Sequence, residues 1–153
     1  MDLESPLQVA ERLLGSDAER FIVVDDNRLD AEIAVTRLAG AVERLIAARW
    51  GYLGAITALD FVGKAEDGQN LPAGRFEVLY IFFSGNATLI LRTSVPDDCP
   101  EVPSICHVIP AATLYERELM EMFGIDVLGT PVKDKLVLPD DWPAGVYPLR
   151  KSF

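Results

Sequence analysis

The sequence has 153 residues, half of them apolar, which is enough for one domain with a substantial core. Its formal net charge of −10 argues against a nucleic-acid backbone or an anionic membrane surface as a partner. The longest apolar run, Val78–Phe83, is much shorter than the roughly 20 residues that a transmembrane helix needs. The N-terminal segment lacks the basic start and apolar block of a signal peptide, and there are only two cysteines, so we expect a cytoplasmic protein.

The first elements are predicted by a helix-start motif and two short apolar patterns. Ser5 and Gln8 form a capping box around a proline at the first helical position, which predicts a helix over Pro6–Leu14. The β-branched run Phe21–Val24 and the alternation over Leu29–Ile33 predict two strands that meet at an acidic turn.

The pattern then changes to a helical period. Apolar residues at helical spacing between Arg37 and Arg49 predict an amphipathic helix that ends near Gly51. Two further apolar, β-branched segments, Leu53–Val62 and Phe76–Phe83, predict strands, and the polar segment Lys64–Gly74 between them predicts a loose loop.

A tight turn at residues 84–86 leads into an alternating strand over Ala87–Val95. Together these elements predict an α/β domain of the α+β type, in which helices pack on a mainly antiparallel sheet. The next segment, Pro96–Pro110, contains four prolines, so we expect an irregular connection there.

A third helix is predicted over Leu114–Phe123. Thr113 and Glu116 are spaced as a capping box, and Gly124 is placed as a left-handed C-cap. Arg117 and Glu121 fall on its polar face as an i,i+4 pair in the less favourable order, so an intermolecular carboxylate is an alternative partner for the arginine.

The last residues predict an extended arm. Prolines and glycines interrupt every window of residues 125–153, yet the segment is rich in apolar side chains. We therefore predict one domain over residues 1–124 and an arm over residues 125–153 that lies against another surface.

Few residues offer catalytic or metal-binding chemistry. Cys99, Cys106 and His107 are too few for an iron–sulfur cluster or a closed zinc site, and we interpret them as two loop thiols and a surface imidazole. Glu116 and Glu118 are the best candidates for acid–base chemistry, but the capping box and the helix dipole already account for them. We predict that the chain itself carries no catalytic, cofactor-binding or metal site.

Two ordered motifs carry a resemblance to a known family. The helix sequence Tyr115–Ile125, which contains Glu-Arg-Glu and ends Met-Phe-Gly-Ile, is followed by the segments Lys135–Trp142 and Pro148–Lys151. From about Arg28 to the end, the chain resembles the 30-kilodalton subunit family of NADH:quinone oxidoreductase (respiratory complex I). Its C-terminal segment looks more like the counterparts in membrane-bound, energy-converting [NiFe] hydrogenases.

The resemblance implies a non-catalytic, cofactor-free scaffold subunit of a membrane-associated electron-transfer complex. Such a subunit docks on the large catalytic subunit, of the 49 kDa or hydrogenase large-subunit type, at the cytoplasmic face of the membrane. Iron–sulfur clusters, and nickel and iron in hydrogenases, would be carried by the partner subunits. The residues that we expect at the partner interface lie on the third helix and the arm: Glu116, Arg117, Glu118, Glu121, Trp142, Tyr147, Pro148, Leu149, Arg150 and Lys151.

Two other functions remain open from the residues. A small enzyme could use Glu116 and Glu118 as a carboxylate pair, and this hypothesis requires a pocket that perturbs their pKa values. A free-standing protein could instead bind a small ligand on its sheet. The scaffold hypothesis differs from both because it requires stable assembly with other subunits.

Overall fold

The structure is a computed structural model that describes residues 3–61 and 74–153. Its helices are α1 (Pro6–Leu14), α2 (Leu38–Ala47) and α3 (Ala112–Phe123), with a short 3-10 helix, η1 (Val35–Arg37), before α2. Its strands are β1 (Ala18–Asp25), β2 (Arg28–Ile33), β3 (Tyr52–Phe61), β4 (Arg75–Ser84), β5 (Ala87–Pro96), β6 (Glu101–Pro103) and β7 (Asp126–Leu128). In these residues, no helix has the length and apolar character needed to cross a membrane.

The first helix and the hairpins form where the sequence predicts them. The capping box at α1 is present, because the Ser5 hydroxyl accepts from the Gln8 backbone and the Gln8 side chain accepts from the Ser5 backbone. The turn between β4 and β5 places Gly85 at a φ of 60°, which favours glycine. Val62 and most of the predicted Lys64–Gly74 loop lie outside the described residues.

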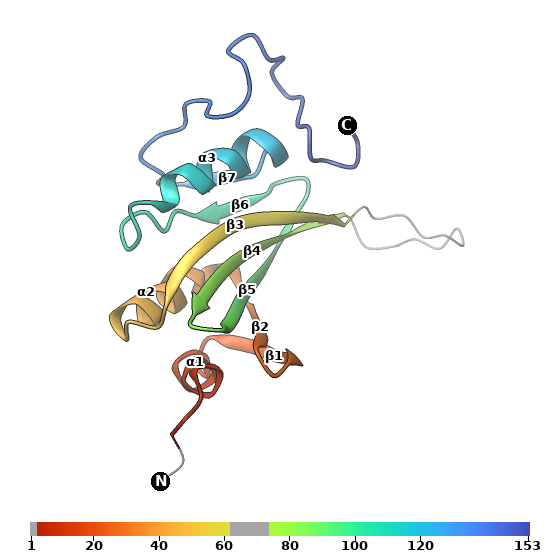
Figure 1. Ribbon diagram of the computed structural model, residues 1–153. Coiled ribbons are helices and arrows are strands. Elements are labelled where there is room, and N and C mark those ends of the chain that lie inside the picture. Colours follow the sequence, from red (N-terminus) through yellow and green to blue (C-terminus); the bar gives the residue numbers. More distant parts are fainter. Residues whose placement is uncertain (1–2, 62–73) are drawn as a thin grey trace, which may run out of the picture.

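The larger sheet has the strand order β1-β2-β5-β4-β3 (Figure 1). Every neighbouring pair is antiparallel except β2 and β5, which are parallel. The parallel pair arises because α2, β3 and β4 all intervene in sequence between these two strands. The prediction of a mainly antiparallel sheet with packed helices is confirmed.

The core lies between one face of this sheet and the helices. Figure 1 shows α2 behind β3, β4 and β5, with α3 along the β3 side of the sheet. The buried side chains alternate along the strands, as in Phe76, Val78, Tyr80 and Phe82 of β4. The opposite face of β3 and β4 receives no helix from the described residues.

The segment before α3 differs from the prediction. Residues 101–103 form β6, which pairs in parallel with β7, so that Val102 lies opposite Val127. Both valines are fully buried, as is Ile125. The prediction of a wholly irregular Pro96–Pro110 segment is therefore wrong. The long-range pairing with β7, which lies beyond the predicted boundary at residue 124, makes residues 101–103 a strand and buries Val102.

A charged cluster that the sequence analysis did not predict lies on the outward face of β2, β5 and β4. Arg92 donates to Asp30 at 3.0 Å and to Glu77 at 2.6 Å, and Arg28 also binds Asp30. Asp30 and Glu77 are buried, and burial of a carboxylate is tolerated when a guanidinium pairs with it. Strand register creates this cluster, since β2 is far in sequence from the β4–β5 hairpin that supplies Glu77 and Arg92.

Candidate functional site

The motif residues of the sequence lie on α3 and on the arm that follows it. Helix α3 ends at Gly124, which has a φ of 68° and donates its backbone N–H to the Met120 carbonyl. A Cβ atom at Gly124 would lie 2.4 Å from the Tyr147 ring. Glycine is therefore needed here both for the left-handed turn and for the close approach of the arm.

Glu116 is the centre of a buried hydrogen-bond network. Its side chain is 1% exposed and accepts from the backbone N–H of Ile105 at 2.7 Å, the hydroxyl of Ser104 at 2.9 Å and the hydroxyl of Thr130 at 2.8 Å. The Cys106 thiol donates to the same carboxylate at 3.1 Å. One glutamate thus connects α3 to the segment before it and to the first residues of the arm.

Two predictions for Glu116 are corrected by this network. The N-cap of α3 is Ala111 and makes no side-chain capping bond, so Thr113 lies inside the helix and there is no capping box. The Glu116 carboxylate points into the interior because four hydrogen-bond donors are available there. These four bonds stabilise the carboxylate more than the single backbone bond of a capping box at the surface would. It is consequently not at the surface where a partner could contact it.

The environment of this network suppresses ionisation of its neighbours. Burial raises the pKa of the Cys106 thiol, and the bond to Glu116 raises it further, against a lowering by Ser104. Burial and the Glu116 charge both raise the pKa of the Tyr80 phenol. The Cys106 thiol is therefore protonated at neutral pH and acts as a hydrogen-bond donor. A nucleophilic or metal-binding cysteine would instead need to be a thiolate.

The remaining metal-ligand candidates are dispersed. Cys99 is exposed, and the nearby Glu101 carboxylate raises the pKa of its thiol. His107 contacts Glu43 of α2 at 3.0 Å. Over residues 3–61 and 74–153, no group of three or more His, Cys, Asp or Glu side chains is placed to hold a metal ion.

Arg117 and Glu121 bind the arm and make no ion pair with each other. Arg117 donates to the backbone carbonyls of Asp134 and Lys135, both at 2.8 Å. The Glu121 carboxylate accepts from the backbone N–H groups of Leu136 and Val137. The predicted i,i+4 pair is thus replaced by charge-assisted bonds to four consecutive arm residues, which have no strand partner of their own.

A second attachment lies near the C-terminus. Arg150 donates to the carbonyls of Phe123 and Gly124, and its guanidinium lies 5.1 Å from the centre of the Phe76 ring and 4.5 Å from that of Tyr147. The backbone N–H of Leu149 donates to the Met122 carbonyl at 3.0 Å. Arg150, which we expect at the partner interface, thus makes its observed bonds within the chain.

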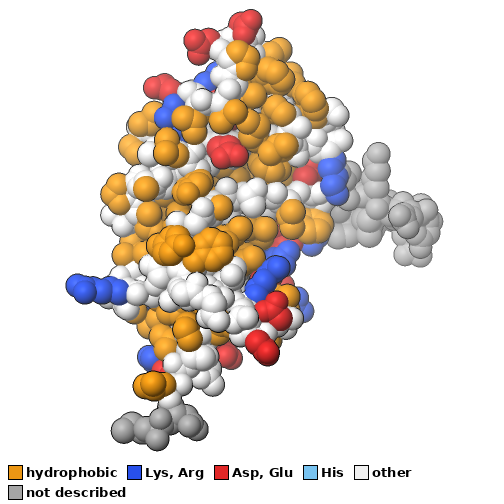
Figure 2. Space-filling view, viewed as in Figure 1, with side chains coloured by type: hydrophobic (Ala, Val, Ile, Leu, Met, Phe, Trp, Pro, Cys, Tyr) orange, Lys and Arg blue, Asp and Glu red, His pale blue; other side chains and the backbone are white. Residues whose placement is uncertain are grey.

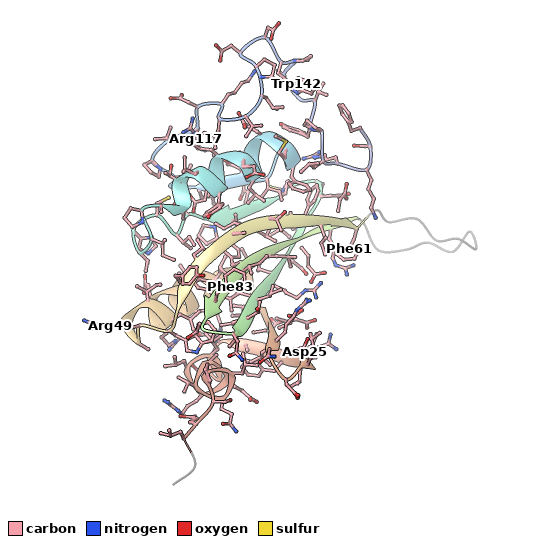
Figure 3. All side chains as sticks on the ribbon, viewed as in Figure 1. Asp25, Arg49, Phe61, Phe83, Arg117 and Trp142 are labelled. Carbon is pink, nitrogen blue, oxygen red and sulfur yellow. The ribbon has the colours of Figure 1, made fainter. Side chains whose placement is uncertain are left out.

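Between the two attachments the arm forms a loop that stabilises itself. The Lys135 ammonium donates to three backbone carbonyls, those of Pro139, Asp140 and Trp142. The Trp142 indole donates to the Val146 carbonyl at 2.8 Å and stacks on the Phe153 ring. Figure 3 labels Arg117 on α3 and Trp142 in this loop. The arm is ordered by side-chain-to-backbone bonds, which apolar periodicity cannot predict.

These bonds leave a set of apolar arm side chains exposed. Val137 is 59% exposed and Phe153 69%, and three others are also substantially exposed: Val132, Leu136 and Leu149. We call these five side chains the arm surface. Among the predicted interface residues, Glu118, Leu149 and Lys151 are exposed, whereas Arg117, Glu121 and Arg150 are engaged with the chain's own backbone.

The part of the chain that contains these motifs matches a known protein family. The sequence matches the family described as respiratory-chain NADH dehydrogenase, 30 Kd subunit, over residues 31–153, which includes all of α3 and the arm. The chain belongs to this family. The resemblance inferred from the Glu-Arg-Glu helix and the Pro-Leu-Arg-Lys element is confirmed.

Similar proteins carry names from both branches of the family. Formate hydrogenlyase subunit 5 of Escherichia coli is 34% identical over 82% of this chain and 21% of its own length. One subunit of NADH-quinone oxidoreductase from a Roseiflexus species is 33% identical over 68% of this chain and 55% of its own. Membrane-bound hydrogenase subunit beta of Pyrococcus furiosus is 44% identical over 41% of this chain and 36% of its own. The chain thus spans about half, or less, of these relatives.

Solved structures share the fold. A chain of an archaeal membrane-bound sulfane sulfur reductase superimposes with a TM-score of 0.74 at 21% identity, covering 96% of this chain and 84% of that one. A trypsin-resistant fragment (1–134) of Nqo5 superimposes with a TM-score of 0.66 at 20% identity, covering 84% and 99%. Both comparisons support the mixed α/β fold of this 30 Kd subunit family member.

Proposed function

We propose that this 30 Kd family member is a non-catalytic docking subunit of a membrane-associated electron-transfer complex, of the complex I or energy-converting hydrogenase type. In this proposal its C-terminal arm binds the large catalytic subunit at the cytoplasmic face of the membrane. The names of the relatives support such an assembly, because they are subunits of NADH-quinone oxidoreductase and of hydrogenases.

The arrangement of the arm is the observation that carries this proposal. Arg117, Glu121 and Arg150 bind backbone atoms, so the shape of the arm is determined by its own chain. The arm surface is left facing outward. A preformed apolar surface loses little conformational entropy on binding, and this is what a stable subunit interface requires.

The two alternative functions receive no support from the geometry of α3. Glu116 is buried and saturated with donors, whereas Glu118 is exposed, so the two carboxylates do not face a common pocket. A hollow of about 350 Å³ lies beside β2 and β4, but two of its charged residues, Glu77 and Arg92, already bind each other. Glu116 and Glu118 therefore do not form the carboxylate pair that the enzyme hypothesis requires.

We expect the arm surface to determine assembly. In the full-length chain, replacing Val137 and Leu149 together with aspartate should reduce recovery of the large subunit roughly tenfold or more, because charge is placed in a desolvated contact. The measurement is co-purification from cells that express the native complex. The matched control is Val23→Asp, since Val23 is 75% exposed on β1, away from the arm. Equal recovery with both variants would refute the arm as the docking surface.

The chain is also proposed to bind no cofactor of its own, with iron–sulfur clusters, and nickel and iron in a hydrogenase, residing in the partner subunits. Its raised Cys99 and Cys106 pKa values disfavour thiolate ligands at neutral pH. We predict that the purified chain contains far less than one iron, zinc or nickel per molecule by elemental analysis. A stoichiometric metal that survives dialysis against a chelator would contradict this.

A further inference from the structure

The outward face of β3 and β4 carries an apolar strip. Because strand residues alternate between faces, side chains pointing away from the helices include those of the register pairs Tyr52–Phe83, Ala55–Ile81 and Thr57–Leu79. We call these six residues, together with Leu59, the open-face strip. Tyr52 is 63% exposed and Leu59 41%, while Leu79, Ile81 and Phe83 are partly exposed.

The composition of this strip is unusual for a solvated face. An antiparallel sheet with one face in water normally alternates apolar and polar residues. In the strip, Thr57 is the one member with a polar aliphatic side chain, and the others are apolar or aromatic. The outward face of β3 and β4 is therefore apolar from the Tyr52–Phe83 pair to the Thr57–Leu79 pair, and it becomes charged at Glu77, the register partner of Leu59. Figure 2 shows hydrophobic side chains gathered over this part of the molecule, with charged groups mostly toward its edges.

One end of the strip is a preformed aromatic platform. The Phe83 ring lies against Gly54, where a Cβ atom would be 2.2 Å from the ring, and the β3–β4 register shifts at this glycine. The Tyr52 ring is 5.9 Å from the Phe83 ring, tilted by 49°. Figure 3 labels Phe83 on the sheet. The close approach of Gly54 positions the Phe83 ring beside Tyr52 on this face.

Most charges beside the strip are paired within the chain, and the Arg75 guanidinium lies over the Phe61 ring. Arg92 pairs with Asp30 and Glu77, and Arg28 pairs with Asp30, so a partner needs no charge to satisfy them. The whole chain carries a net charge of −10, which opposes contact with an anionic lipid surface. These charges therefore favour an apolar protein surface over an anionic membrane as the binding partner of the strip.

The length and width of the strip limit the size of the partner element that can cover it. From Tyr52 to Leu59 the strand advances about 23 Å, and two strands with their side chains are about 10 Å wide. The resulting footprint of roughly 230 Å² is well below the ~800 Å² that each partner contributes to a stable interface, so a second copy of the chain could not be held by this strip alone. One α-helix is about 10 Å across and covers 23 Å with about 15 residues.

We propose that the open-face strip binds one amphipathic helix of a partner subunit. The helix lies along β3 and β4 with apolar residues at i, i+3, i+4 and i+7 against the strip, and without charge where it crosses Phe83 and Ile81. This contact is separate from the arm surface, so it adds a second docking site to the proposed function.

Site-specific photocrosslinking in the assembled native complex tests the proposal. A benzophenone amino acid is placed at position 52 in one full-length variant and at position 59 in another, and the crosslinked peptides are identified by mass spectrometry. The expected products are crosslinks to one helix of another subunit, at positions about 15 residues apart. Crosslinks to a second copy of this chain, to lipid, to a non-helical segment or to this chain alone would overturn the proposal.

A substitution provides an independent readout. Leu59→Lys should reduce the yield of the position-52 crosslink about tenfold or more, while the melting temperature of the isolated chain stays within a few degrees of wild type, because Leu59 is partly exposed. Val23→Lys on β1 is the matched control and should leave the yield unchanged. An unchanged yield with Leu59→Lys, or an equal loss with Val23→Lys, would refute the strip as a specific site. Since arm-surface variants alter a different contact, failure of the arm proposal leaves these crosslinks as an independent result.

Discussion

Replacing Glu116 with alanine is expected to lower the free energy of unfolding by about 3–5 kcal/mol. The carboxylate accepts from Ser104, Ile105, Cys106 and Thr130, and the substitution would leave these donors without their acceptor. Three of them, Ser104, Ile105 and Thr130, are buried. Each unsatisfied buried donor costs about 1–3 kcal/mol unless water enters the cavity. Urea denaturation of the isolated chain measures this change.

Two variants sharpen the interpretation of the Glu116 result. Glu116→Gln keeps the shape and one good acceptor but places an amide N–H₂ against donors, so we expect an intermediate loss of about 1–3 kcal/mol. Glu118→Ala removes an exposed carboxylate two residues along the same helix, on its opposite side, and should change stability by less than about 0.5 kcal/mol. Similar stabilities for Glu116→Ala and Glu118→Ala would show that the network does not stabilise the fold.

Removing the arm after Pro131 is expected to separate folding from assembly. The shortened chain keeps the sheet, the helices and the bond from Thr130 to Glu116, so it should still unfold cooperatively. It loses the Arg117, Glu121 and Arg150 contacts, which should cost about 1–3 kcal/mol because most of them are solvent-exposed. Recovery of the large subunit should fall roughly tenfold or more, since the apolar arm surface is absent.

The matched comparison is a chain truncated after Leu128. This shorter chain also loses Thr130 and leaves one side of the Glu116 carboxylate without its donor, so it should be less stable than the Pro131 truncation by about 1–3 kcal/mol. Melting curves and co-purification are measured for both. If the Pro131 truncation recovers as much large subunit as the full-length chain, the arm serves only its own domain and the docking proposal is wrong.

Local interactions explain which elements could be predicted from the sequence. Helix α1 begins where Ser5 and Gln8 satisfy its first backbone donors, and the β4–β5 turn occurs where Gly85 allows a positive φ. Gly124 ends α3 for the same conformational reason. These devices act within a few residues, so the sequence order contains all the information that they need. The family motif was likewise readable because its residues are contiguous in α3 and in two arm segments.

The tertiary structure decided the interactions that join distant segments. In an isolated helix Glu116 would take part in a capping box. In the fold it accepts hydrogen bonds from Ser104, Ile105 and Thr130, each more than ten residues away from Glu116 in the sequence. Arg117 and Arg150 could each pair with a partner carboxylate, yet the fold places backbone carbonyls within their reach. Strand register similarly created the Asp30–Arg92 pair. The sequence by itself determined helix α1 with its capping box, the β4–β5 turn, the Gly124 C-cap and the family. Which charges are satisfied internally, and which apolar surfaces remain for partners, depended on long-range packing that no local pattern encodes.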